Sequence, residues 1–425
     1  MRTIRMLILS GCVSCLGFIQ PSQAQSPSKQ VSLQTVEDSF LVKNYLLLAQ
    51  RYQVDASKAL IRQAKMWSNP SFSTVLGFGS TDHFKPFDVG SGGETQYNVD
   101  QLIQLAGKRN KSIQIAAAAA KMSEATFDEL VRTLRLQLRE NFYNIYYQQQ
   151  TEKVLDEQLG NLQKIVDAYV TADKKGSVAH SDLVRLQALQ VGIENDYADL
   201  KQQELASQKN LQQLLHTRDF YEATLQPADL ASYNLDKIQL PQLLDSATQN
   251  RPDVRIAAVQ YQTAQLNYRL QKSLAVPDLH LGGTYDKQGS YINNFVGLTL
   301  GIDLPVWNRN QGNIRAAQLQ IGSEKQQLLQ QQSIAETEVL NAYQRIVALE
   351  KRYKGFDLHL FQHEFDALID EVAKNFSKGN ISLLQFIDYF NSYSDNAKNI
   401  NKFLSNRVSA YEELNYATGQ ELFKN

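Results

Sequence analysis

The sequence predicts a mainly α-helical fold with a small β part, in which one structural plan is built twice. Three observations carry the prediction. Two short regions alternate apolar and polar residues with a period of two, as half-exposed β-strands do. Around them lie helical stretches, rich in Ala, Gln, Leu and Glu, that are too long for a compact domain. Finally, marker residues recur in the same order in both halves of the chain.

The clearest β signal lies in residues 277–305, which we expect to form a β-hairpin. Its second strand alternates large apolar residues with Gly297, Thr299 and Gly301, so one face is apolar and the other is small or polar. Residues 70–105 carry a second hairpin of the same design. The positions expected on the apolar faces are Phe72, Leu76, Phe78, Val99, Ile103, Leu279, Leu281, Val296, Leu298, Leu300 and Ile302.

Such strands suit either a soluble sheet with one buried face or a membrane barrel that is apolar outside and wet inside. The second copy favours the barrel, in which the apolar positions face lipid. Four strands cannot close a barrel, because known single-chain barrels need about eight and an open edge in lipid leaves unpaired backbone groups. Two chains would give a bore filled by side chains, whereas three would give twelve strands around a water-filled pore. We therefore predict a homotrimer.

The duplication covers about half of the chain per copy. Four pairs of markers recur at separations of about 200 residues: Asn44 and Asn250, Pro70 and Pro277, Arg109 and Arg309, and Gly176 and Gly379. We predict a first repeat over 25–215 and a second over 241–425, joined by a linker at 216–240 that lacks the helical period. The linker is expected to hold short elements packed against the middle of the helices.

Residues 1–24 have the pattern of a secretory signal, with a basic start, an apolar core and Ala24 before the expected cleavage site. The alternative is lipid attachment at Cys12, because Leu9 to Cys12 also resembles a lipobox. Both cysteines, Cys12 and Cys15, lie in this segment, so cleavage after Ala24 excludes disulfides and Cys-based metal sites. The net charge of −1 gives no sign of nucleic-acid binding. No later stretch has the roughly 18 apolar residues of a transmembrane helix.

Each repeat is expected to contain a leading helix, a hairpin and a long helical hairpin. In the first repeat the helices are predicted at 31–67, from 108 to Lys175, and from Gly176 back to 215. In the second they are predicted at 241–273, 313–377 and 382–416, with a break at 378–380 and the ordered part ending at 417–419. Apolar stripes on the long helices predict coiled-coil seams, as at Leu134, Leu138, Phe142 and Ile145.

The ordered, duplicated motifs resemble those of the TolC-type outer membrane efflux proteins over nearly the whole mature chain. The matching residues are Asn44, Asn69-Pro70, Gly107-Lys108-Arg109, Asn250-Arg251-Pro252-Asp253, Pro277 and Leu304-Pro305. The resemblance implies a trimer with a 12-stranded outer-membrane barrel continued by an α-helical barrel across the periplasm of a Gram-negative-type bacterium. It implies an exit duct for tripartite pumps, working with a periplasmic adaptor and an inner-membrane transporter. Residues 308–317 resemble the CzcC-like branch, which implies heavy-metal cations and a resistance-nodulation (RND) transporter; drug efflux and type I secretion remain alternatives.

The same resemblance implies two sites. The helix breaks resemble the tip motif that meets the adaptor, at Gly176, Val178, Asp182 and Leu183 in one repeat and Gly379, Ile381 and Leu384 in the other. A glycine permits the positive φ that ends a helix, so a plain helix-capping turn explains these breaks as well. Asp388 stands where some relatives carry acidic residues that line the closed entrance and bind cations. Its alternative is a solvated surface carboxylate.

No catalytic constellation, phosphate loop or cofactor motif is visible, so we expect a protein that is not an enzyme and holds no cofactor. His359 and His363 have a spacing that can bind zinc, but without a nearby Cys we interpret them as surface residues. Two readings from other classes stay open. A periplasmic adaptor also has long helical hairpins, although it normally has only one, between β-rich halves. The other is a soluble periplasmic coiled-coil enzyme or scaffold.

Overall fold

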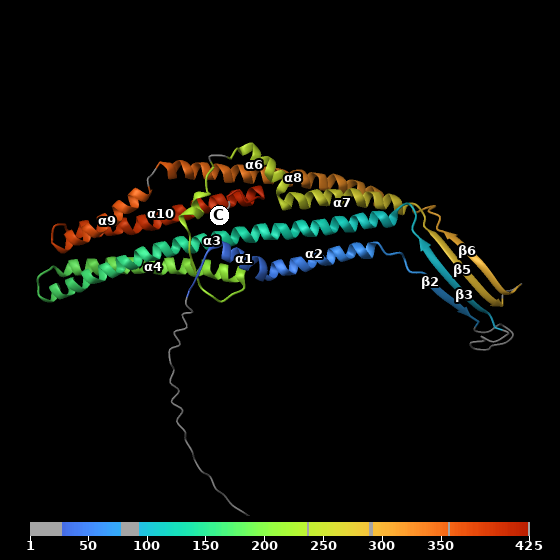
Figure 1. Cartoon of the computed structure of the whole chain (residues 1–425), viewed down its shortest axis with the longest axis horizontal. Coiled ribbons are helices and arrows are strands. Elements are labelled where there is room, and N and C mark those ends of the chain that lie inside the picture. The colour runs from blue at the N-terminus through green and yellow to red at the C-terminus, as the bar shows by residue number, and fades with distance from the viewer. Residues whose placement is uncertain (1–27, 78–92, 236–237, 289–291, 356–357, 424–425) are drawn as a thin grey trace, which may run out of the picture.

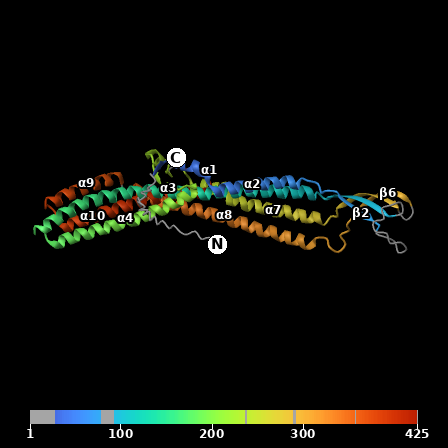
Figure 2. The same ribbon diagram turned by 90° about the horizontal axis from the view of Figure 1, so that it is seen from below.

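The computed structural model describes residues 28–77, 93–235, 238–288, 292–355 and 358–423. The described chain is a long, slender rod of helices with a small sheet at one end (Figures 1 and 2). This arrangement confirms the predicted fold class, mainly helical with few strands. The expected signal segment 1–24, with Cys12 and Cys15, lies outside the described residues.

One antiparallel sheet contains both predicted hairpins. Strands β2 (Ser71–Leu76) and β3 (Thr95–Ile103) form the first, and β5 (Leu279–Gln288) and β6 (Asn293–Ile302) form the second. The strand order is β2-β3-β5-β6, with β3 and β5 paired so that Ile103 lies opposite Leu279. The two halves of the chain therefore share one sheet, joined edge to edge by backbone hydrogen bonds.

The first helical hairpin matches its expected form closely. Helix α3 runs unbroken over Lys108–Lys174, 67 residues, and α4 returns over His180–Leu215. At 1.5 Å per residue α3 is about 100 Å long. Gly160 does not interrupt it, since a single helical glycine costs only about 1 kcal/mol relative to alanine.

The second hairpin differs from its expected form. The predicted single helix 313–377 is wrong: α8 (Gln311–Lys354) ends at a C-cap on Gly355, and α9 (Leu358–Ser377) begins anew. The return helix α10 covers Leu383–Thr418. The chain also stays ordered beyond the expected end at 417–419, because Phe423 is buried against Tyr233 and Tyr411.

Each predicted leading helix is in fact two helices. The helix expected at 31–67 divides into α1 (Leu33–Lys43) and α2 (Tyr45–Ala64), and the one at 241–273 into α6 (Leu240–Asn250) and α7 (Pro252–Leu274). The physical reason is capping. Asn44 adopts an extended conformation and its side-chain oxygen accepts from the backbone N–H groups of Leu46 and Leu47. In the second repeat Pro252 at the first helical position does not allow α6 to continue.

Both breaks are tied to the end of the returning helix of the same repeat. The Asn44 side chain donates to the carbonyl of Leu214 in α4, at 2.9 Å. Arg251 donates to the carbonyl of Ala417 in α10, at 3.1 Å. Because both acceptors lie in the last helical turn, where carbonyls lack intrahelical partners, each contact satisfies a group that would otherwise need another donor.

The linker 216–240 holds short elements, as expected. Strand β4 (Tyr221–Ala223) and helix α5 (Pro227–Ala231) lie in it, and β4 pairs in parallel with β1 (Lys29–Val31), a strand that the sequence did not predict. Gln149 and Gln208 hold β4 against the long helices, since both side chains donate to the carbonyl of Tyr221.

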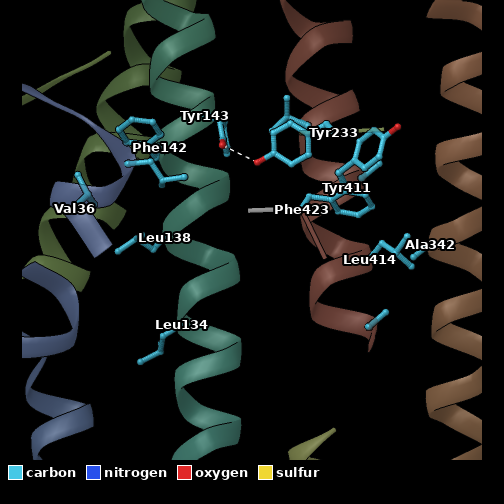
Figure 3. Packing of buried hydrophobic residues seen from close by; sticks show 14 of the residues in the cluster. Val36, Leu134, Leu138, Phe142, Tyr143, Tyr233, Ala342, Tyr411, Leu414 and Phe423 are labelled. Carbon is cyan, nitrogen blue, oxygen red and sulfur yellow. Dashed lines mark hydrogen bonds between the residues drawn. The ribbon is translucent and has the colours of Figure 1, made fainter. Parts of the chain in front are cut away.

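The core consists of two separate apolar clusters along the rod. The larger one, at mid-length, packs α1, α3, α8 and α10 around the linker residue Tyr233; Figure 3 shows Leu138, Phe142, Tyr143 and Tyr411 from it. The smaller one lies toward the turn end of the helical hairpins and contains Leu162, Leu183, Leu186, Phe386 and Phe390.

Toward the sheet the helices form a single layer whose order repeats that of the strands. The main contacts in this half are α2 with α3, α3 with α7, and α7 with α8. Since α2 leads into β2, β3 into α3, α7 into β5 and β6 into α8, the order α2-α3-α7-α8 continues β2-β3-β5-β6. One curved wall thus runs from sheet to helices without crossing (Figure 1).

Candidate functional site

The strand register sorts the side chains of the sheet onto two different faces. Directly paired residues lie on the same face of a sheet, and the pairs Phe72–Val99, Ile103–Leu279, Leu281–Leu300 and Leu279–Ile302 place the predicted apolar positions together. Leu76, Val296 and Leu298 share this face by their register. Most of these side chains are exposed in the single chain, with Leu298 90% exposed, whereas Ile103 and Leu279 are half-buried. Phe78 lies outside the described residues.

The opposite face is mainly polar and closely packed near its centre, and Val75, Leu102 and Phe295 are its apolar members. Gln96 donates to Asn98 and to Thr284, and the ring nitrogen Nδ1 of His280 lies 2.9 Å from a carboxylate oxygen of Asp100. Gly282 fits here because a Cβ would come within 2.4 Å of the Thr299 hydroxyl and 2.7 Å of the Val99 carbonyl. One face of the sheet is therefore apolar and unprotected, and the other is suited to water.

The far end of the rod carries two turns of the same construction. Gly176 has φ +67° and Gly379 has φ +76°, the left-handed region that favours glycine. In the first turn the N–H of Gly176 donates to Asp173 and that of Ser177 to Ala172; in the second, Gly379 donates to Phe376 and Asn380 to Asn375. Both are Schellman motifs. A Cβ would meet no atom within 4 Å at either glycine, so conformation and not space requires the glycine.

The structure brings most of the predicted tip residues to this end. Gly176, Gly379 and Leu384 are exposed, whereas Val178, Asp182 and Ile381 are half-buried. Leu183 is different: it is only 6% exposed and packs in the smaller apolar cluster. Its side chain does not reach the surface, because it begins the buried stripe of α4 that continues with Leu186.

Asp388 lies in the second turn of α10, nine residues after Gly379, and its side chain is exposed. Among the described residues it has no ion pair, whereas the nearby Asp395 contacts Lys398 at 2.9 Å. Within the described part of the chain, no group of three or more His, Cys, Asp or Glu residues could hold a metal ion. The side chains of His359 and His363 are outside what the structure describes.

Sequence reasoning missed a buried polar network at the middle of the rod. Glu412 on α10 is 2% exposed; it accepts from Arg139 of α3 at 2.9 Å and from the Tyr233 hydroxyl of the linker at 2.6 Å. Tyr233 in turn contacts the Tyr143 hydroxyl at 2.7 Å (Figure 3). Arg139 also donates to Glu37 of α1 at 2.5 Å. Four elements distant in sequence are thus joined through three charged side chains, Arg139, Glu412 and Glu37.

The network shifts the ionisation of its members. Burial raises the pKa of Tyr233 and the Glu412 carboxylate raises it further, so the hydroxyl remains protonated and donates. Burial alone lowers the pKa of Arg139, but Glu412 and Glu37 outweigh it and hold that pKa above its ordinary value. Arg139 therefore stays charged and the Tyr233 hydroxyl stays a donor near neutral pH, which fits a structural role for the network.

A second set of ion pairs anchors the break at Arg251. Its guanidinium binds Asp253 and Glu338, each at 2.6 Å, and Arg132 of α3 lies 3.3 Å from the same Asp253. Burial raises the pKa of Asp253, but the hydrogen bond from Arg251 and the charge of Arg132 bring it below its usual range. Only the local motif at 250–253 was visible in the sequence, because the partners Glu338 and Arg132 are distant along the chain.

None of the described helices has the length and apolar character that a membrane crossing requires. A family model described as outer membrane efflux protein matches residues 37–216 and 243–420. The chain belongs to the outer membrane efflux protein family. Members of this family are passive channels and not enzymes. The match confirms the resemblance drawn from the motifs and goes against the adaptor and scaffold readings.

Individual relatives agree with the family assignment. The cobalt-zinc-cadmium resistance protein CzcC of Cupriavidus metallidurans is 25% identical over 279 residues, 64% of this efflux protein and 63% of CzcC, so less than two thirds of that relative is spanned. The CmeC outer membrane channel of Campylobacter jejuni superposes with a TM-score of 0.75 at 14% identity, covering 92% of this chain and 86% of CmeC. CusC, whose structures are reported for folding and transmembrane channel formation, superposes with a TM-score of 0.73 at 17% identity. The superposition covers 91% of this chain and 92% of CusC.

Proposed function

We propose that three copies of this chain form the outer-membrane exit duct of a tripartite efflux system. The observation that carries this proposal is the uninterrupted wall β2-β3-β5-β6 and α2-α3-α7-α8. Among the described strands, the outer edges of β2 and β6 have no partner. These edges run in opposite directions, so β6 of one subunit can pair antiparallel with β2 of the next, and α8 then meets α2. Three subunits give twelve strands, a barrel wide enough for water.

Exposed apolar residues on the outer helices support the same closure. On α2, Leu46 is 59% and Tyr52 75% exposed; on α8, Leu319 is 59% and Leu329 48% exposed. Residues of this kind are expected to be covered in the assembled protein. The apolar face of the sheet then contacts lipid and the polar face lines the pore, with the rod extending into the periplasm.

For the cargo we propose divalent heavy-metal cations delivered by an RND transporter through a periplasmic adaptor. The similarity to a cobalt-zinc-cadmium resistance protein supports this assignment. Deleting the gene for this protein should lower the concentrations of zinc, cobalt and cadmium that the bacterium tolerates. In native mass spectrometry, the purified protein should have the mass of three chains. A monomeric mass would contradict the proposed trimer. Unchanged tolerance to all three metals, together with lost tolerance to drugs, would contradict the proposed cargo.

The adaptor is proposed to contact the two tip turns. Val178→Asp places a charge beside Gly176 on a half-buried surface that an apolar helix tip would cover, so metal tolerance should be lost while trimers still assemble. The matched control is Val191→Asp, the same change on the exposed side of α4 (60% exposed), away from the turn. Full metal tolerance in the Val178→Asp strain would refute the docking role.

Asp388 is proposed to bind cations at the periplasmic entrance. Its carboxylate is exposed and unpaired among the described residues, so it is free to attract a divalent ion. Asp388→Asn should weaken block by zinc in single-channel recordings, whereas Asp395→Asn, whose carboxylate already contacts Lys398, should change it less. Unaltered zinc block in Asp388→Asn would remove the gate role.

A further inference from the structure

The junction between sheet and helices has an unusual composition. We define the collar as residues 65–70, 104–111, 274–278 and 303–310, which link the four strands to α2, α3, α7 and α8. The only two tryptophans of the chain, Trp67 and Trp307, both lie in it, one in each repeat. Trp67 is 64% exposed and Trp307 90% exposed, so neither serves the core of the subunit.

Each tryptophan has an arginine of the collar near it, in space for Trp67 and along the chain for Trp307. The guanidinium of Arg109 lies 4.5 Å from the centre of the Trp67 ring and donates to the carbonyl of Lys65. Arg309 donates to the carbonyl of Val306, the residue before Trp307. The duplicated pair Arg109 and Arg309 thus supplies one cation to each half of the collar, over the indole of Trp67 in the first half and two residues along the chain from Trp307 in the second.

The collar and the adjoining helix ends are strongly basic. The collar contains Lys65, Lys108, Arg109, Lys111 and Arg309 against the acidic residues Asp278 and Asp303. Asp278 is already used, since it pairs with Lys108 at 2.7 Å. The neighbouring helical segments 56–64, 108–123, 254–274 and 311–323 contain no Asp or Glu at all. A negative partner beside the collar would therefore meet little electrostatic opposition.

We propose that the collar is the docking surface for the anionic phospholipid headgroups of the periplasmic leaflet. This rests on the proposed membrane-spanning trimer, because the collar directly continues the apolar face of the sheet. Tryptophan is favoured where an apolar phase meets a polar one, and each Lys or Arg near an anionic membrane surface adds about 1 kcal/mol to binding. The collar fixes the depth of the barrel in the membrane, with the sheet in the hydrocarbon and the helices in water.

The two tryptophans make the depth measurable. In protein reconstituted in vesicles of phosphatidylglycerol, lipids brominated near the headgroup should quench most of the intrinsic emission, and lipids brominated near the end of the acyl chain should quench several-fold less. Trp67→Phe and Trp307→Phe assign the signal to each site. Quenching by aqueous acrylamide without quenching by either lipid would overturn the proposal, because the rings would then lie in the pore or the periplasm. Protection from all three quenchers would also overturn it, since the rings would be buried between subunits.

The charge contribution is tested with matched variants. In native mass spectrometry with added phosphatidylglycerol, Arg109→Gln and Arg309→Gln should each reduce lipid retention by about fivefold, and Lys174→Gln and Lys175→Gln at the opposite end should leave it unchanged. Equal retention of phosphatidylglycerol and phosphatidylcholine by the unaltered protein would refute the anionic preference. Leu298→Trp, in a chain lacking both native tryptophans, separates the two proposals. Quenching at position 298 by the acyl-chain label, combined with no headgroup quenching of Trp67 and Trp307 in the unaltered protein, refutes only the collar. No quenching at position 298 by either lipid refutes the membrane-spanning function itself.

Discussion

Gly176 and Gly379 have positive φ angles, a left-handed backbone conformation that costs residues with a Cβ about 1 kcal/mol. The open space around both glycines means that this cost is not increased by any steric clash. The two turns therefore depend on φ alone, and substitutions there test backbone conformation without disturbing packing.

We expect Gly176→Ala to destabilise the first tip turn by about 1 kcal/mol. Gly160→Ala provides the matched control, because Gly160 lies within α3 in equally open space and alanine should strengthen the helix by a similar amount. In Gly176→Ala, the backbone amides at positions 176 and 177 should exchange hydrogen about fivefold faster than in the unaltered protein, which corresponds to the expected free-energy change. Equal exchange rates in the two variants would contradict the proposed role of φ.

At the scale of elements, the linker is fixed to the rod by the carboxylate of Glu412, which Arg139 and Tyr233 share. Losing a buried hydrogen bond to a charged group costs about 1.5–3 kcal/mol, and the cost rises to about 3–5 kcal/mol where the remaining charge has no other partner. An exposed pair contributes about 0–1 kcal/mol.

The neighbouring residues Glu412 and Glu413 provide a direct comparison. Glu412→Gln should lower the free energy of unfolding by about 2 kcal/mol, because Arg139 loses one charged partner and keeps Glu37. Glu413→Gln, whose partner Arg345 is 44% exposed, should lower it by less than about 1 kcal/mol. The measurement is the denaturant midpoint of the helical circular dichroism in detergent. Midpoints that shift equally would show that burial of Glu412 does not matter for stability.

The elements differ in how far the sequence could predict them. The hairpins and their faces were predictable, because alternation in Val296 to Ile302 is local and survives in the sheet. The breaks at Asn44 and Arg251 have local signals, a capping asparagine and Pro252, which helical periodicity alone does not detect. Their contacts with the carbonyls of Leu214 and Ala417, about 170 residues away, were not predictable. Strand β1 was missed for the same reason: three residues carry no usable period, and its partner β4 lies in the linker.

The candidate site shows the same limit. Gly176 and Gly379 were identified because a glycine between two helical runs is a local signal. The burial of Leu183 depends on packing against other helices, and the pairing of Arg139 with Glu412 joins residues 273 positions apart. Periodicity could place a residue on a stripe, but the partner of that stripe is a property of the folded chain.

At the scale of the whole molecule, the membrane proposal makes the two faces of one strand unequal. Leu298→Arg places a charge on the apolar face, which should cost about 2–4 kcal/mol for insertion into lipid. Thr299→Arg places the same charge on the polar face of the same strand, where water can solvate it. The amount of heat-resistant trimer in outer-membrane fractions should fall several-fold in the first variant and stay near normal in the second. A similar loss in both would go against the assignment of the faces.

The two Schellman turns have a consequence for any molecule that meets the end of the rod. In a ring of three subunits, six turns with the same backbone would alternate around the rim, giving pseudo-sixfold symmetry on a threefold assembly. A partner that reads only the backbone would attach in six copies. A partner that distinguishes Val178 from its counterpart Ile381 would attach in three. The stoichiometry of the docked complex would therefore reveal which of these two kinds of recognition operates.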